Sequence, residues 1–352
     1  MKVRTFMPLL AAALVVVLAL AVGAGTGAAR SDAKAGSKFK VALVTDIGGL
    51  DDRSFNFLAN KGLKQAVAQG DVQGRVFISK SNADYVPNLS TAARGGYDLV
   101  ISVGFLMGDA TSAVAKRFPK VKFAIIDNSG TPKDLKGRPT NVRGLLFKEQ
   151  EAGYLVGYLA ALAAKNRPNS AGVVAAVGGL KIPPVDRFIA GYYAGAKKGW
   201  AAVKVQHSYS QNFVDQALCK EQALNHIANG ASVVFQVAGQ CGLGVLSAAK
   251  EKKVWGIGVD ADQGYLGPHV LTSATKKVDV AVFSTIQAAK VSGAKFRTGF
   301  NAIFTVKNGG VGYGAMSRQS QPSWKKAAEN VRRQIANGTI KGIPTAPPAT
   351  TG

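Results

Sequence analysis

The chain has 352 residues, enough for two domains of ordinary size, and a formal net charge of +24 at pH 7. Its 44 lysines and arginines are scattered in short clusters, without an arginine-rich stripe or interleaved aromatic residues. The charge therefore favours a solvated basic surface close to an anionic cell envelope over nucleic-acid binding.

Residues 1–29 have the layout of a secretory signal peptide. Basic residues precede an uncharged run that contains the apolar stretch 9–22, and small residues at 27–29 offer a cleavage site. An uncleaved membrane anchor is the alternative, because the run approaches the length of about 18 residues that spans a bilayer. We expect cleavage, which leaves a flexible leader over residues 30–38.

The stretch 41–70 predicts a strand, a tight polar loop and a helix. Its first residues are apolar and half β-branched, and two glycines at 48–49 allow a sharp turn. Apolar side chains then recur at helical spacing from Phe55 onward. Asp51 or Asp52 suits the N-cap of this helix.

Further along the chain, strands and helices alternate with short connections. The expected strands are 75–79, 98–103, 122–127, 142–147, 171–177, 203–209, 232–237, 254–260, 269–274 and 300–306. The expected helices are 86–94, 107–118, 149–165, 185–199, 214–228, 243–250, 278–291 and 324–336. This alternation predicts an α/β protein with two doubly wound parallel sheets. Ligands bind where the strands of such sheets end, so the strand-end carboxylates Asp127 and Asp260 are candidate ligand groups.

Six stretches resemble, in the same order, motifs of the basic membrane protein family, the substrate-binding proteins of ABC-type importers, many of which bind purine nucleosides. The most specific is T-D-x-G-G-x-D-D-x-S-F-N at residues 45–56. The others are the helix start at 147–160, Y-S-Q-N-F-V-D at 209–215, the glycine-rich stretch 237–244, G-I-G-V-D-A-D-Q at 256–263 and L-T-S-A-T-K-K-V-D at 271–279. The resemblance covers residues 40 to about 344, and we interpret the stretch 147–160 as structural.

The resemblance implies the plan of type I periplasmic binding proteins: two doubly wound domains joined by a hinge that the chain crosses three times, with the ligand cleft between them. We assign residues 39–146 with 263–298 to an N-terminal lobe, 147–262 with 299–344 to a C-terminal lobe, and 345–352 to a tail. Family members are commonly lipoproteins with a cysteine just after the apolar run. No cysteine lies there in this chain, so we expect export to the periplasm or cell envelope without a lipid anchor.

The resemblance also implies how one end of the ligand is bound. Phe55 and Phe213 would face each other across the cleft, about 7 Å apart, and stack on the two faces of a planar base. Asp127 and Asn56 would pair with the edge of the base. The alternative for Phe213 is a hydrophobic staple at a helix start.

The other end of the site would bind a sugar. Asp260 would accept hydrogen bonds from ribose hydroxyls and Lys276 would donate one, with Lys277 as the alternative by a one-residue slip. Asp46 and the backbone at Gly239 would complete the cleft. A turn or capping role is the alternative for Asp260, and an ordinary glycine-rich turn for Gly239.

Cys219 and Cys241 are the two cysteines of the chain. The first is expected on a helix and the second after the following strand, so they lie on neighbouring elements of an exported chain. We expect a disulfide, with two buried thiols as the alternative. The spacing does not suit a metal site, and the glycines at 239–244 depart from the dinucleotide-binding pattern, so we expect no cofactor.

These features predict an exported, monomeric binding protein, not an enzyme, that captures guanosine, inosine or adenosine and delivers it to an ABC permease, without binding nucleic acid. A type I binding protein for a sugar, or one with a sensory role, is the first alternative. The second is a nucleoside hydrolase, whose calcium-binding opening D-T-D-P-G-x-D-D resembles residues 44–52. Val44 stands where the first aspartate is needed, and one extra residue separates Asp46 from Asp51.

Overall fold

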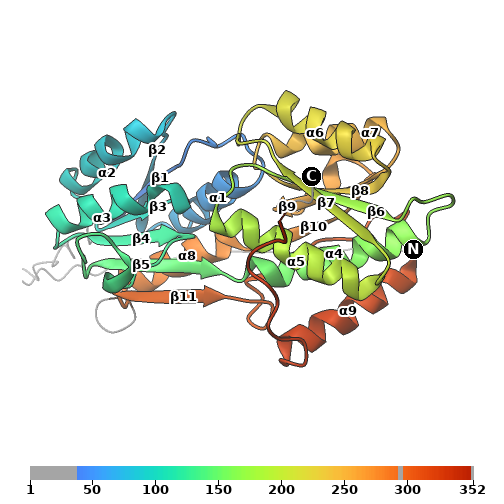
Figure 1. The fold of residues 1–352 in the computed structure, drawn as a ribbon. Helices are drawn as coiled ribbons and strands as arrows, with labels where there is room; N and C mark the ends of the chain where they lie inside the picture. The colour runs from blue at the N-terminus through green and yellow to red at the C-terminus, as the bar shows by residue number, and fades with distance from the viewer. Residues whose placement is uncertain (1–37, 292–295, 350–352) are drawn as a thin grey trace, which may run out of the picture. The chain divides into compact units, whose positions relative to one another are not determined.

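The computed structural model of the protein describes residues 38–291 and 296–349 (Figure 1). The expected signal peptide, the leader up to Ser37 and residues 350–352 lie outside the described residues. Across the two described ranges, no helix has both the length and the apolar character needed to cross a bilayer.

Strands and helices alternate along the chain, as expected. The strands are β1 (Phe39–Val44), β2 (Val72–Phe77), β3 (Leu99–Ser102), β4 (Lys122–Ile126), β5 (Val142–Phe147), β6 (Val173–Gly178), β7 (Lys204–Tyr209), β8 (Ala231–Val237), β9 (Trp255–Asp260), β10 (Val270–Lys276), β11 (Phe300–Phe304) and β12 (Val311–Tyr313). The helices are α1 (Phe55–Val67), α2 (Tyr85–Arg94), α3 (Gly108–Arg117), α4 (Glu149–Lys165), α5 (Pro183–Gly199), α6 (Gln216–Ala228), α7 (Gly242–Glu251), α8 (Val278–Lys290) and α9 (Pro322–Ala336).

The strands form two six-stranded sheets, ordered β11-β5-β4-β3-β1-β2 and β12-β10-β9-β8-β6-β7. Neighbouring strands pair in parallel, except that β10 and β12 are antiparallel. We call the first sheet with α1–α3 and α8 the first lobe, and the second sheet with α4–α7 and α9 the second lobe (Figure 1). The predicted pair of doubly wound parallel sheets is confirmed.

The chain passes between the lobes three times, after β5, after β10 and after β11. Two segments lie in the lobe opposite to our assignment. Strand β10 pairs with β9 in the second sheet, whereas we placed residues 263–298 in the N-terminal lobe. Strand β11 pairs with β5 in the first sheet, whereas we placed it in the C-terminal lobe. The apolar pattern of a strand does not show which sheet it joins, because its partners are distant in sequence.

Helices α4 and α5 pack with their backbones in close contact. A Cβ atom added at Gly157 would lie 2.1 Å from the carbonyl oxygen of Tyr192, and one added at Gly195 would lie 1.9 Å from that of Tyr154. Only glycine permits this approach, which is the structural role we expected for the small residues of α4. The contact extends to the start of α4, because a Cβ atom added at Gly191 would lie 2.1 Å from the carbonyl oxygen of Gln150.

Candidate functional site

A cavity that is partly open to solvent is lined by residues of both lobes. Strands β1, β3 and β4 of the first sheet and β8, β9 and β10 of the second end at its walls. All the residues predicted to bind a ligand line this cavity: Asp46, Phe55, Asn56, Asp127, Phe213, Gly239, Asp260 and Lys276. The structure thus brings the predicted set together; that these residues bind a ligand stays a prediction.

Asp52 organises the loop that precedes α1. Its carboxylate accepts hydrogen bonds from the backbone N–H groups of Ser54, Asn56 and Phe57, at 3.0, 2.7 and 3.0 Å. These amides would otherwise lack partners, because the first turn of a helix has no carbonyls ahead of it. The N-cap position itself is Ser54, but Asp52 accepts the capping hydrogen bonds that we expected Asp51 or Asp52 to accept. It thereby places Phe55 and Asn56 at the cavity.

Asp46 and Asn56 form a buried polar pair. Asn56 Nδ2 donates to Asp46 Oδ1 at 2.7 Å, and the N–H of Gly48 donates to the same oxygen at 3.0 Å. Asn56 Oδ1 has no hydrogen-bond partner among the residues that the structure describes. Burial raises the pKa of Asp46 to about 6, although the hydrogen bonds from Asn56 and Gly48 lower it. The pair presents oxygen acceptors at the cavity wall.

Lys276 is a buried cation at the end of β10. Its Nζ lies 2.6 Å from Asp127 Oδ1, 3.0 Å from Glu149 Oε1 and 5.0 Å from the centroid of the Phe55 ring. Burial alone would lower the pKa of this ammonium group, but the carboxylates of Asp127, Glu149 and Asp260 outweigh burial and raise it. The lysine stays charged because it is paired inside the protein.

These contacts decide two questions left by the sequence. We grouped Asp127 with Asn56 at the base edge, but its carboxylate forms an ion pair with Lys276 and so lies at the lysine end of the cavity. Lys276, and not Lys277, lines the cavity, and the side chain of Lys277 is exposed.

Glu149 is a site residue that our sequence reasoning missed, because we interpreted its stretch as purely structural. It is the first residue of α4, it is fully buried, and it contacts Lys276 from behind the cavity wall. Burial raises its pKa, and the attraction of Lys276 opposes this. An acidic residue two positions after a strand was the available signal, similar to the one that identified Asp127 directly after β4.

Asp260 connects the lobes from the end of β9. Its Oδ2 accepts a hydrogen bond from Ser54 Oγ of the first lobe at 2.9 Å. Burial raises the pKa of Asp260 to about 7, although Lys276 and the Ser54 hydrogen bond lower it. Asp260 and Asp127 have φ angles of +59° and +66°, values that residues other than glycine seldom adopt. Backbone strain of this kind is concentrated at functional sites.

Phe213 reaches the cavity from the loop between β7 and α6. A Cβ atom added at Gly179 would lie 2.3 Å from Phe213 Cε1, so the ring packs directly against this glycine. Gly239, with a φ of +56°, approaches the backbone of Phe213 from the loop after β8. The ring therefore lines the cavity rather than only closing a helix start. Stacking of a base between Phe55 and Phe213 stays a prediction.

Two further aromatic residues, Phe105 and Phe188, line the cavity and were missed. Phe105 follows Gly104 at the end of β3, where a Cβ atom would lie 2.7 Å from Asp46 Oδ2. Its position shortly after the end of a strand could have identified Phe105 as a candidate. Phe188 lies on α5, and no local signal distinguishes a helical residue that faces a cavity from one that faces the core.

This fold and cavity define a class: a two-lobed binding protein with the type I periplasmic binding protein fold. Within that class, the chain belongs to the Bmp family, described as PnrA-like ABC transporter substrate-binding proteins, whose profile matches residues 39–344. The resemblance seen in the sequence is confirmed, and the protein is a substrate-binding component of an ABC transporter.

Similar proteins support this assignment. The chain is 36% identical over 335 residues to the ABC transporter nucleoside-binding protein BmpA of Lactococcus lactis subsp. cremoris, which covers 89% of this chain and 91% of the relative. It is 33% identical to the CD4+ T-cell-stimulating antigen of Listeria innocua, covering 99% of this chain and 100% of the relative. An ABC transporter solute-binding protein of Aeropyrum pernix has a similar structure, with a TM-score of 0.77 at 29% identity over 87% of this chain and 94% of that one.

Proposed function

We propose that this protein captures a purine nucleoside in the cavity between its lobes, outside the cytoplasmic membrane, and delivers it to the permease of an ABC importer. One observation supports this most directly: a single cavity combines aromatic rings, buried acceptor oxygens and one buried ammonium group. A nucleoside has matching parts, a flat base with polar edges and a ribose with hydroxyls. It is neutral, so the net charge of the protein does not attract it.

The base would lie between Phe55 and Phe213, with its edge at Asn56 and Asp46. Because Asn56 Nδ2 already donates to Asp46, the amide oxygen of Asn56 is left to accept a hydrogen bond. An acceptor in this place favours a base edge that carries N–H groups. The ammonium of Lys276 lies over the Phe55 ring, so the base would stack on the other face of that ring.

The ribose would lie at Asp260 and Lys276. One oxygen of Asp260 accepts the hydrogen bond from Ser54, and the other would accept from a ribose hydroxyl. The lysine ammonium has three N–H groups, and it donates to Asp127 and Glu149. The third would donate to the ribose. Hydrogen bonds with one charged partner are roughly twice as strong as neutral ones, so this end would contribute strongly to affinity.

Delivery would depend on the closure of the two lobes. The Ser54–Asp260 hydrogen bond and the Lys276–Asp127 ion pair each join the lobes, and all four residues lie at the cavity or next to it. A ligand that contacts Asp260 and Lys276 would stabilise the same closed arrangement, which a permease can then recognise. We further propose that the protein is exported, acts as a monomer and catalyses no reaction.

Calorimetric titration with guanosine, inosine, adenosine, ribose and the free bases tests the proposal. We expect at least one purine nucleoside to bind, and ribose and the bases to bind much more weakly because each uses one end of the site. A sugar that binds as tightly as any nucleoside would contradict the proposal and favour the sugar-binding alternative. Release of ribose from inosine would contradict the absence of catalysis. Unchanged nucleoside uptake by cells that lack the protein would contradict delivery.

A further inference from the structure

We propose that the Cys219–Cys241 disulfide positions the ring of Phe213 and thereby sets ligand affinity, separately from its effect on stability. The disulfide would do so by holding residues 210–215, which we call the Phe213 loop. This inference rests on the proposed function in one respect, because it takes Phe213 as a ring that contacts the ligand.

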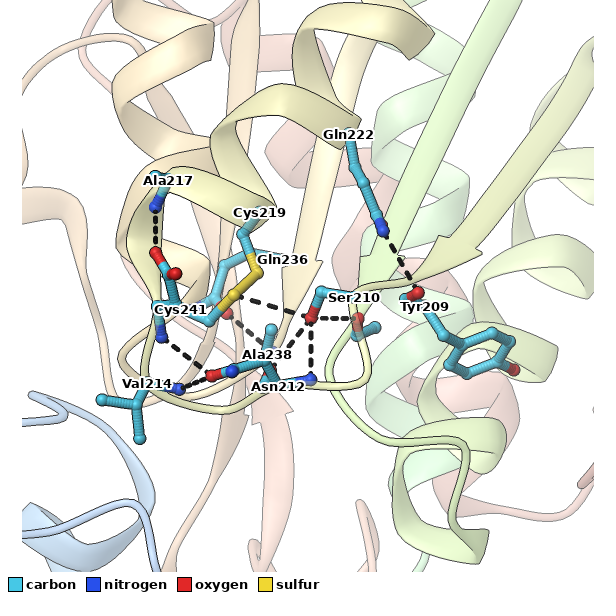
Figure 2. Close-up of a disulfide and its surroundings, with 12 residues drawn as sticks. Tyr209, Ser210, Asn212, Val214, Ala217, Cys219, Gln222, Gln236, Ala238 and Cys241 are labelled. Carbon is cyan, nitrogen blue, oxygen red and sulfur yellow. Dashed lines mark hydrogen bonds between the residues drawn. A yellow bond between two sulfur atoms is a disulfide. The ribbon is translucent and has the colours of Figure 1, made fainter.

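The disulfide joins two of the second-lobe segments that lie next to the cavity. Cys219 lies in α6, which begins directly after the Phe213 loop, and Cys241 lies two residues after Gly239, directly before α7. The two Cα atoms are 5.5 Å apart and both side chains are fully buried. Figure 2 shows the bridge beside Ser210 and Asn212 of the loop.

Hydrogen bonds continue from Cys241 into the Phe213 loop. The backbone N–H of Cys241 donates to the carbonyl oxygen of Phe213 at 3.0 Å. The sulfur of Cys241 lies 3.5 Å from Ser210 Oγ, which donates to the carbonyl oxygen of Asn212 at 2.9 Å (Figure 2). Asn212 Oδ1 accepts from the N–H groups of Val214 and Asp215. The disulfide thus fixes Cys241, whose backbone N–H holds the carbonyl group of Phe213.

Little apolar packing holds the second half of this loop. Residues 214–218 are exposed, and the first buried residue after Phe213 is Cys219 itself. The first half is anchored independently, because the N–H groups of Ser210 and Gln211 donate to the carbonyls of Gly178 and Gly179. Beyond the packing of Phe213 itself against the core, the disulfide is therefore the covalent restraint on this half of the loop.

The ring has little freedom to adjust when the loop moves. It packs so closely against Gly179 that an added Cβ atom there would lie 2.3 Å from Phe213 Cε1. A small displacement of the loop would therefore turn or lift the ring instead of being absorbed locally. Since stacking requires a ring parallel to the base, such a change would weaken binding while the fold is retained.

A double-mutant cycle separates positioning from general stability. The paired variant Cys219→Ala/Cys241→Ala is combined with Phe213→Ala and, as a matched control from the first lobe, with Phe55→Ala. We expect the pair to weaken guanosine binding by about fivefold in the wild-type and Phe55→Ala backgrounds, and by less than about twofold with Phe213→Ala. Equal losses in all three backgrounds would overturn the proposal. If the Cys219→Ala/Cys241→Ala variant does not fold, wild-type protein whose disulfide has been reduced by a phosphine is used in its place. The same losses of affinity are then expected.

Hydrogen exchange without ligand separates this inference from the proposed function. We expect the amides of Cys241, Val214 and Asp215 to exchange faster in the paired variant, while amides of β1 and β3 exchange as in the wild type. Unchanged exchange at these amides would overturn positioning by the bridge. If no nucleoside binds the wild type, the proposed function fails, and the exchange measurement still decides whether the bridge holds the loop.

Discussion

Two parts of the cavity wall differ in how they are held in place. One is a polar network of Asp46, Asn56, Asp260 and Lys276, in which each side chain is at most 8% exposed and is hydrogen-bonded or ion-paired. The other is Phe213, on a loop followed by exposed residues and restrained by a disulfide. Displacing a buried polar group leaves partners unsatisfied, whereas displacing a ring on an exposed loop does not. Changes in the polar network should therefore alter stability and affinity together, and changes around Phe213 should alter affinity alone.

The largest effect is expected from Lys276→Met. It removes the ammonium between Asp127 and Glu149. The buried carboxylate of Asp127 then loses its counter-charge, and that of Glu149 retains the ion pair with Arg187, at 3.5 Å. We expect the free energy of unfolding to fall by about 3–5 kcal/mol and nucleoside binding to be lost. Urea unfolding followed by circular dichroism measures the first effect, and calorimetry measures the second.

The matched control is the triple variant Lys276→Met/Asp127→Asn/Glu149→Gln. It removes the unpaired charges and should recover part of the lost stability, but it should not restore binding, because the ammonium is still absent. A Lys276→Met protein as stable as the wild type would show that the buried ion pairs do not hold this wall together.

Comparing Asp260→Ala with Phe213→Ala tests the contrast between the walls directly. We expect each to weaken nucleoside binding by roughly 10- to 100-fold, through loss of a charge-assisted hydrogen bond or of one stacking face. Only Asp260→Ala should also change the unfolding midpoint, since it removes one hydrogen-bond partner of Ser54 Oγ. Normal binding by both variants would rule out the two-ended site, and equal unfolding midpoints would rule out the contrast.

Two glycine substitutions sharpen the comparison with a smaller perturbation. A Cβ atom at Gly48 would lie 2.8 Å from Asn56 Nδ2, and one at Gly179 would lie 2.3 Å from Phe213 Cε1. We expect Gly48→Ala to cost about 1–3 kcal/mol of stability, because Asn56 cannot move without losing its bonds. Gly179→Ala should instead weaken nucleoside binding several-fold with little change in the unfolding midpoint. Thermal unfolding and calorimetry measure the two effects. A Gly48→Ala protein of unchanged stability, together with a destabilised Gly179→Ala protein that binds normally, would contradict the contrast between the two walls.

The smallest effect is a dependence on pH. The pKa values of Asp46 and Asp260 are raised to about 6 and about 7 from a usual value of 3.8. The folded, ligand-free protein therefore keeps protons that the unfolded chain has already released, and the free energy of unfolding should decrease as pH rises from about 4 to about 7. Nucleoside hydroxyl and N–H groups donate to the charged carboxylates, so affinity should change in the opposite direction and increase several-fold from about pH 5.5 to pH 8.

Calorimetry in buffers of different ionisation heat measures both the affinity and the protons released on binding. Asp260→Asn should have a weaker pH dependence than the wild type, since this side chain no longer titrates. Affinity that is unchanged or higher at the acidic end would contradict the assignment of Asp260 as an acceptor for the ligand.

The candidate site was largely predictable because its residues follow strand ends. Asp127 and Asp260 could be found in this way from the sequence alone, and Phe105 follows the same rule. Phe213 and Lys276 also lie near the ends of expected strands, but only the resemblance to the family distinguished them from their neighbours in the sequence. Glu149 was overlooked because the glycines and alanines that follow it predict close helix packing, which the structure also contains.

Local sequence was sufficient to predict the alternation of strands and helices, the glycine-rich turns and the capped start of α1, because these depend on residues close together in the chain. The folded chain was needed to show that β10 belongs to the second sheet and β11 to the first, since strand partners come from distant segments. It also decided that Lys276 pairs with Asp127, 149 residues away, which places both at one end of the cavity. Burial and neighbouring charges set the pKa values of Asp46 and Asp260, and both arise only when the two lobes enclose these side chains.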